Sequence, residues 1–153
     1  MKLAVMAFGR LRSRELAAVA ADYARRLARY APTEVVELRD ERGQDAAARR
    51  KEAARLEAAL RQDDHVVLLD ERGRQLLSRE LAGLLAERTR SGAGRLIFVV
   101  GGPFGVDDSV RHRANLVLSL SRMTLPHELV RVVLLEQLYR AWTILRGEKY
   151  HHG

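Results

Sequence analysis

The sequence predicts an α/β domain in which a mainly parallel sheet carries helices on both faces. Short apolar runs typical of strands alternate along the 153 residues with segments whose apolar residues recur at helical spacing. The strand-like runs are apolar throughout, as is usual for parallel strands that are covered on both faces. No Pro-, Gly- or Ser-rich linker and no internal repeat divides the chain. We therefore expect a single domain over residues 1–153.

The first half of the chain predicts three strands and two helices. Ser13 is placed to cap the first helix, because its hydroxyl can accept a hydrogen bond from the first turn, and Pro32 follows the end of that helix. A turn at 70–73 is expected to close the third strand. The expected strands cover residues 2–8, 34–38 and 65–69, and the expected helices cover residues 13–30 and 45–60.

The second half predicts two more strands and three helices, of which the last is apolar nearly all round. One apolar stripe runs through Leu129 and Val133, another runs through Leu134 and Leu138, and Trp142 lies between them. Such a helix must be buried nearly all round. We expect a second copy of the chain to cover one stripe, which makes the protein a homodimer; the alternative is a central helix inside one subunit. The expected helices cover residues 78–90, 107–114 and 127–146, and the expected strands cover residues 96–100 and 116–120.

The amino-acid composition indicates what kind of partner the protein binds and excludes several kinds of site. The chain has 27 Lys and Arg against 20 Asp and Glu, a net charge of +7, and 24 of the 27 cations are Arg. Because the planar guanidinium binds phosphate through two hydrogen bonds, we expect a polyanionic partner such as nucleic acid. The absence of Cys excludes a disulfide scaffold, a thiolate zinc site and a Cys nucleophile. No apolar run approaches the roughly 20 residues of a membrane span, so we expect a cytoplasmic protein without a membrane segment.

Three loops are expected to form a ligand site, because ligands of open α/β sheets bind at the carboxyl ends of the strands. These loops cover residues 69–73, 101–105 and 119–126. Gly101 and Gly102 can adopt positive φ and leave bare backbone beside a ligand, although the glycines of a simple structural turn are the alternative. The third loop interleaves Ser and Thr with Leu and Met, which suits a flat heterocycle such as adenine better than a phosphate. His127, at the start of the last helix, is expected to have a capping or packing role.

Two further groups of polar residues lie near the end of the chain. Glu136 and Arg140 are four residues apart on the last helix, a spacing that permits an ion pair. That pair is either structural or presents Arg140 to a bound anion. Tyr150, His151 and His152 follow in a tail, where a trailing His pair is more typical of disorder than of catalysis. Two His without a third ligand do not predict a metal site.

The motifs then combine into a resemblance. In order, they are Val-Val-Gly-Gly-Pro-Phe-Gly at 99–105, Leu-Ser-Leu-Ser-Arg-Met-Thr-Leu-Pro-His at 118–127, Leu-Tyr-Arg-Ala-Trp at 138–142 and Tyr-His at 150–151. This set resembles the RlmH family of SPOUT-class methyltransferases, which modify a pseudouridine of 23S ribosomal RNA. The resemblance covers essentially the whole chain, including its length and the opening Met1-Lys2-Leu3.

The resemblance implies a trefoil knot over about residues 65–153, a homodimer with each active site between subunits, and S-adenosylmethionine bound in the knot. The implied reaction transfers the donor's methyl group to N3 of a pseudouridine in helix 69 of 23S rRNA within the ribosome. We expect neither a metal nor a membrane among its partners. The residues that the resemblance assigns to the cofactor are Leu69, Gly101, Gly102, Gly105, Leu120, Ser121, Arg122, Met123, Thr124 and Leu125.

The resemblance also suggests catalytic roles. Loss of the N3 proton leaves a negative charge that Arg140 would stabilise, with His151 as the proton acceptor or base-orienting group. An imidazole suits that role because it ordinarily titrates near pH 6.5. Tyr150 would stack on or position the base. Other family members have Pro before this Tyr-His pair, whereas this chain has Lys149. The alternatives are a non-catalytic RNA- or ribosome-binding protein and a flavodoxin-like nucleotide binder.

Overall fold

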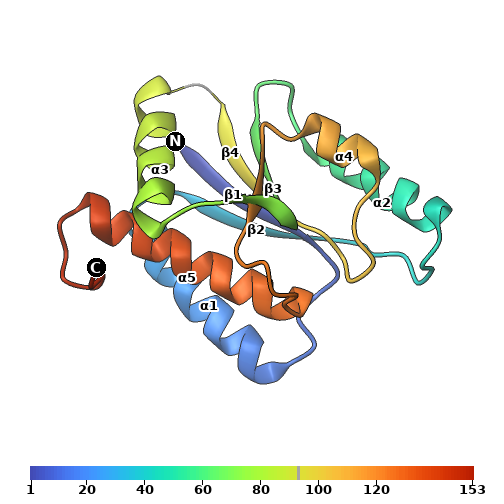
Figure 1. Ribbon diagram of the computed structural model, residues 1–153, viewed down its shortest axis with the longest axis horizontal. Helices are drawn as coiled ribbons and strands as arrows, with labels where there is room; N and C mark the ends of the chain where they lie inside the picture. The colour runs from blue at the N-terminus through green and yellow to red at the C-terminus, as the bar shows by residue number, and fades with distance from the viewer. Residues whose placement is uncertain (93) are drawn as a thin grey trace.

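The computed structural model describes residues 1–92 and 94–153. Within those residues all ten predicted elements are present, and only one end, that of the third strand, differs from its prediction by more than two residues (Figure 1). In chain order the elements are β1 (Lys2–Phe8), α1 (Arg14–Ala28), β2 (Thr33–Leu38), α2 (Ala46–Ala59), β3 (His65–Gln75), α3 (Ser78–Ser91), β4 (Arg95–Val100), α4 (Asp108–Arg113), β5 (Leu116–Ser119) and α5 (His127–Leu145).

The five strands form one parallel sheet in the order β2-β1-β4-β3-β5. In the centre of the sheet Val5 of β1 lies opposite Val35 of β2 on one side and Phe98 of β4 on the other. Phe98 in turn lies opposite Val67 of β3. Because every pairing among these strands is parallel, their carboxyl ends meet at one edge. The predicted parallel sheet is confirmed.

Helices cover both faces of the sheet. Leu3 and Val5 alternate along β1 with Ala4 and Met6, and the two sets belong to different apolar clusters. The cluster with Leu3 and Val5 contains residues of α1, α3 and α5, and the cluster with Ala4 and Met6 contains residues of α2 and α4 (Figure 1). Burial on both faces explains why β1, β3 and β4 contain continuous apolar runs instead of alternating ones.

The caps of the first two helices follow from the sequence. Ser13 Oγ accepts a hydrogen bond from the amide of Leu16, 3.2 Å away, as predicted. Asp45 caps α2 in the same way through the amide of Ala48, at 2.9 Å. Each side chain satisfies an amide that the first helical turn leaves without a partner.

The predicted end of the third strand is wrong. β3 continues beyond Leu69 to Gln75, with a shift of register at which both Leu69 and Arg74 lie opposite Leu118 of β5. Residues 70–73 therefore bulge from a strand that resumes on the same partner. Gly73 permits this close approach, because a Cβ there would lie 2.6 Å from the carbonyl oxygen of Val117.

Eight of the 19 residues of α5 are buried within one subunit. Leu134, Leu135 and Leu138 are covered in the cluster that α5 forms with α1, α3 and the sheet. The alternative of a central helix therefore accounts for most of its apolar surface, because α1 and α3 flank it on both sides (Figure 1). Leu129 and Val133 remain half-buried. The homodimer stays a prediction that rests on this smaller surface.

A buried ion pair at the amino edge of the sheet gives a stability prediction. The Asp64 carboxylate is fully buried and accepts two hydrogen bonds from Arg95, at 2.7 and 2.9 Å, and one from the amide of Arg61. Asp64→Ala would leave the Arg95 charge without its partner in a largely buried position. We expect the free energy of unfolding in urea to fall by about 3 kcal/mol. Asp63→Ala, at the exposed neighbouring position, is the control and should change it by less than about 0.5 kcal/mol; equal effects would contradict the prediction.

Candidate active site

A cavity of about 580 Å³ opens at the carboxyl edge of the sheet. Its size lies within the range of about 300–1,000 Å³ that is usual for small-molecule sites. The three predicted loops, 69–73, 101–105 and 119–126, meet around it, and the first turn of α5 closes one side. The residues that line it are Leu69, Asp70, Glu71, Arg72, Val100, Gly101, Gly102, Pro103, Gly105, Val106, Arg111, Leu118, Leu120, Ser121, Met123, Thr124, Leu125, Pro126, His127 and Val130.

Nine of the ten residues assigned to the cofactor line this cavity. Arg122 is the exception, because it is exposed and does not contribute to the wall. The nine that line it are Leu69, Gly101, Gly102, Gly105, Leu120, Ser121, Met123, Thr124 and Leu125.

The glycines of the second loop act differently from the prediction. Positive φ occurs at Gly105, where it is 84°, and not at Gly101 or Gly102. Gly101 is needed for space instead, because a Cβ there would lie 2.8 Å from Cγ1 of Val106, which also lines the cavity. The absence of a side chain at Gly101 therefore allows the loop to fold back over the end of β4.

The hydroxyl groups of the third loop hold its shape. Ser119 Oγ donates to the carbonyl of Ser121, and Ser121 Oγ accepts from the amide of Met123, each at 2.9 Å. Thr124 Oγ1 donates to Glu71 at 2.7 Å and so joins this loop to the bulge of β3. Because these hydroxyls are hydrogen-bonded within the protein, the side chains of Leu118, Leu120 and Leu125 give this part of the cavity an apolar wall. That combination of apolar surface and exposed backbone suits a flat heterocycle.

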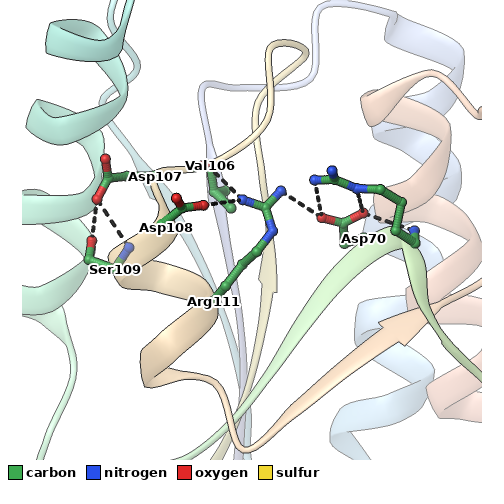
Figure 2. Close-up of polar contacts among 7 residues, drawn as sticks. Asp70, Val106, Asp107, Asp108, Ser109 and Arg111 are labelled. Carbon is green, nitrogen blue, oxygen red and sulfur yellow. Dashed lines mark hydrogen bonds and ion pairs between the residues drawn. The ribbon is translucent and has the colours of Figure 1, made fainter.

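An ion pair forms the polar wall of the cavity (Figure 2). Arg111 of α4 donates to Asp70 at 2.8 Å, to the carbonyl of Val106 at 3.2 Å and to Asp108 at 3.2 Å. Burial alone would raise the pKa of Asp70, but hydrogen bonds from the Arg72 amide and from Arg111 outweigh it and lower this pKa to about 2. Nothing in the sequence indicated this pair, because its members are 41 residues apart and Asp70 was expected in a simple turn. The Asp70 carboxylate in the wall is therefore ionised at neutral pH and paired with Arg111.

The Asp70 carboxylate predicts acid sensitivity. Its pKa in the folded chain lies below its ordinary value of 3.8, so its stabilisation is complete above pH 4 and is lost as pH falls from about 4 to about 2. Between pH 5 and pH 2 we expect the unfolding free energy of the wild type to fall by about 2 kcal/mol more than that of Asp70→Asn. Urea titrations across this range measure the difference, with Asp63→Asn as the control. Parallel pH profiles for wild type and Asp70→Asn would contradict the prediction.

The predicted catalytic residues form a second cluster, at the other end of α5. Arg140 binds Glu136 through Nη2, at 2.8 Å, and through Nε, at 3.1 Å, which confirms the expected pair. Arg140 Nη1 lies 3.1 Å from Nδ1 of His151, and the Tyr150 hydroxyl donates to Glu136 at 2.9 Å. The structure therefore brings Arg140, Tyr150 and His151 together around one carboxylate.

The tail is packed against the helices, contrary to the disorder that its His pair suggested. The ring of Tyr150 meets that of Tyr139 edge-on at 4.8 Å and lies 4.8 Å below the Arg140 guanidinium. Its hydroxyl is 3.4 Å from that of Tyr23 on α1. Burial raises the pKa of Tyr150, and the hydrogen bonds with Tyr23 and Glu136 raise it further. The sequence did not indicate Tyr23 or Tyr139, because only the folded tail brings them to Tyr150.

The cavity and the tail cluster do not meet within one chain. Arg140 lies thirteen positions after His127, which is in the cavity wall, and this offset corresponds to about 20 Å along the helix. No residue after Val130 lines the cavity. Figure 1 shows the start of α5 beside the carboxyl edge of the sheet and the C-terminus at the opposite end of the helix. Any site that uses both groups needs a second subunit.

Residues 1–92 and 94–153 contain neither a membrane-spanning helix nor a metal cluster. No helix there combines the length and the hydropathy that crossing a membrane requires. No three His, Asp or Glu side chains gather there in an arrangement that could hold a metal ion.

Comparison with known proteins identifies the family. Residues 1–151 match the family model described as "Predicted SPOUT methyltransferase". The ribosomal RNA large subunit methyltransferase H of Geobacter metallireducens is 46% identical and that of Gloeobacter violaceus is 49% identical, each over the full length of both chains. A probable methyltransferase from Bordetella pertussis shares the fold, with a TM-score of 0.57 at 16% identity over 92% of this chain and 93% of that one. The chain therefore belongs to the SPOUT methyltransferase family, and within it to the RlmH family that its motifs resemble.

Proposed function

We propose that this protein methylates N3 of a pseudouridine in helix 69 of 23S rRNA, with S-adenosylmethionine as the methyl donor. SPOUT methyltransferases use this donor, and the full-length relatives are named as methyltransferases of large-subunit rRNA. The observation that carries the proposal is the cavity at the carboxyl edge, where three loops of the SPOUT chain converge. Such a substrate is met in the cytoplasm, where ribosomes are assembled.

The residues of the cavity fit the donor. S-adenosylmethionine, when bound, supplies a methyl group that its sulfonium activates. Leu69, Leu118 and Leu120 offer apolar wall for an adenine, and backbone groups of the loops at 101–105 and 120–125 offer it hydrogen bonds. The Asp70 carboxylate, ionised at neutral pH, offers an acceptor for hydroxyl or ammonium groups. These features would hold a molecule with one flat apolar end and one polar end.

The cluster of Arg140, Tyr150 and His151 around Glu136, here called the tail cluster, fits the chemistry of the acceptor base. N3 of pseudouridine carries a proton between two carbonyl groups, and its loss leaves negative charge on N3 and the carbonyl oxygens. Arg140 would stabilise that charge, since the Glu136 carboxylate raises the pKa of Arg140 and keeps it cationic. His151, beside Arg140, would accept the proton or orient the base. The raised pKa of Tyr150 keeps its phenol neutral, so that it can stack on or position the base.

A homodimer would bring the two groups together. Leu129 and Val133 leave an apolar strip on the exposed side of α5, in line with Arg140 further along the helix. In a twofold symmetric interface the same strip meets itself. If the twofold axis is perpendicular to the helices, two α5 helices that cross there run in opposite directions. The Arg140 end of one helix would then lie near the His127 end of the other. Each cavity would thus be completed by the tail of the partner subunit.

Mass mapping of rRNA tests the proposed function. Ribosomes from a strain that lacks this activity are treated with the protein and S-adenosylmethionine that carries a labelled methyl group. We expect one labelled methyl group in the fragment that contains helix 69, at N3 of a pseudouridine. Calorimetry in parallel should show binding of S-adenosylhomocysteine and none of FMN. Unlabelled rRNA would contradict the methyltransferase, and binding of FMN alone would support a flavodoxin-like protein.

A further inference from the structure

Three arginines without partners follow the first strand. Arg10, Arg12 and Arg14 are all exposed. None of them makes an ion pair, or a hydrogen bond through its side chain, with another residue in the described ranges. By contrast, Arg111 in the cavity wall is paired with Asp70, and Arg140 is paired with Glu136. The turn between β1 and α1, together with the first residue of α1, therefore presents three positive charges that the fold leaves free for a ligand.

Hydrogen bonds hold this turn beside the cavity. Oε1 of Glu128, in the first turn of α5, accepts from the amides of Arg12, at 3.0 Å, and Ser13, at 3.1 Å. The Ser13 amide is the main reason that the pKa of Glu128 is lowered, so the carboxylate stays ionised and keeps both bonds. Glu128 directly follows His127, which lines the cavity. Figure 1 shows the β1–α1 turn beside the start of α5.

An exposed aromatic ring lies on the neighbouring loop. Phe104 is 49% exposed and, unlike Pro103 and Gly105 on either side of it, does not line the cavity. Because both of its neighbours line the cavity, Phe104 belongs to the loop at the mouth of the cavity, while its own side chain stays out of the wall. β1 and β4 are adjacent, with Ala7 opposite Val100. The β1–α1 turn and the loop at 101–105, which contains Phe104, therefore begin at strand ends that lie about 5 Å apart. Nothing in the described part of the chain accounts for a phenyl ring exposed to water at this position.

We propose that Arg10, Arg12, Arg14 and Phe104 form an RNA-docking surface at the mouth of the cavity. This inference rests on the proposed function and names the residues that hold its substrate. The arginines neutralise phosphates of the strand, and Phe104 stacks on an unpaired base next to the one that is methylated. Single-stranded loops of RNA offer phosphates and unstacked bases within a few ångströms of each other, which suits free cations beside an exposed ring.

Salt dependence tests the arginines. Unmethylated ribosomes are the substrate, and kcat/KM is measured at several salt concentrations for wild type, for R10Q/R12Q/R14Q and for K2Q/R61Q/R90Q. The second triple variant removes the same charge from exposed positions at the amino edge of the sheet. We expect R10Q/R12Q/R14Q to lose at least about tenfold in kcat/KM near 0.15 M salt, and the slope of log kcat/KM against log salt to become shallower by about 2, since each phosphate contact contributes about 0.7.

Two controls make these outcomes decisive. The affinity for S-adenosylhomocysteine, measured by calorimetry, should be the same in all three proteins, because the arginines lie outside the cavity wall. If the two triple variants showed equal slopes of log kcat/KM against log salt, the docking surface would be contradicted. The proposed function would still stand in that case, provided that the wild type methylates rRNA. Loss of the dimer in R10Q/R12Q/R14Q alone, seen by sedimentation, would also overturn it, because the surface would then be a subunit interface. An inactive wild type would instead reject the proposed function.

A substitution series tests Phe104. Phe104→Ala should raise KM for ribosomes about tenfold with little change in kcat, because one base would lose its stacking partner. Phe104→Tyr should restore KM, whereas Phe104→Leu, which keeps an apolar side chain but no ring, should not. Equal rescue by Leu and Tyr would show that the position needs only apolar bulk and would contradict stacking.

Discussion

Replacement of Arg140 by alanine is expected to slow rRNA methylation by about a thousandfold and to leave the affinity for S-adenosylhomocysteine within about twofold of wild type. The loss follows from removing the cation next to the charge that develops on the base. The affinity should persist because Arg140 does not line the cavity of its own subunit. Single-turnover methylation of ribosomes and calorimetry measure the two quantities separately.

Matched variants distinguish this role from simple destabilisation. Arg146→Ala removes an exposed arginine at the end of the same helix, where its guanidinium lies 5.7 Å from the centre of the Tyr30 ring, and should keep full activity. Arg140→Lys keeps the charge but not the paired hydrogen bonds to Glu136, so we expect partial activity. His151→Ala should also slow methylation, because it removes the group beside Arg140 that would accept the proton or orient the base. Full activity in both Arg140→Ala and His151→Ala would reject the roles proposed for the tail cluster.

Gly101→Val is expected to weaken the binding of S-adenosylhomocysteine by at least about a hundredfold and to remove detectable methylation. A Cβ at this position would already lie 2.8 Å from Val106, so a branched side chain must displace the loop that forms one side of the cavity. The loop lies at the end of β4, and we expect the melting temperature to fall by only a few degrees.

Gly83→Ala is the control for that substitution. Gly83 lies in α3, and a Cβ there would meet no other atom within 4 Å, so alanine should raise helix stability slightly and leave binding unchanged. Normal cofactor affinity in Gly101→Val would show that the loop at 101–105 is a structural turn, which was the alternative that the sequence left open.

The sequence predicted most of the scaffold because the strands are short, apolar and separated by amphipathic helices. Val66 to Leu69 and Leu96 to Val100 are buried on both faces, and a parallel sheet between two helical layers provides that environment. The three cavity loops followed from the same reasoning, since parallel strands end at one edge. The bulge after Leu69 was missed, because it depends on the close approach of Gly73 to Val117 on a strand far along the chain.

Features that depend on distant contacts could not be predicted. The pairing of Asp70 with Arg111 has no local signal, and neither has the packing of Tyr150 against Tyr23 and Tyr139. The trefoil knot that SPOUT membership implies could not be predicted from the number and order of the strands, because the general rules of chain topology exclude knots. The extent to which α1 and α3 cover α5 could not be predicted either, because the sequence does not say that they pack against it.

Mixing of subunits tests most directly whether a cavity and a tail from different chains form one active site. Arg140→Ala and Gly101→Val subunits, each inactive alone, are unfolded together, refolded and assayed on unmethylated ribosomes. Random pairing makes half of the dimers mixed, and each mixed dimer contains one intact cavity facing one intact tail, so we expect about a quarter of wild-type activity. A mixture as inactive as its two parents would contradict the shared site.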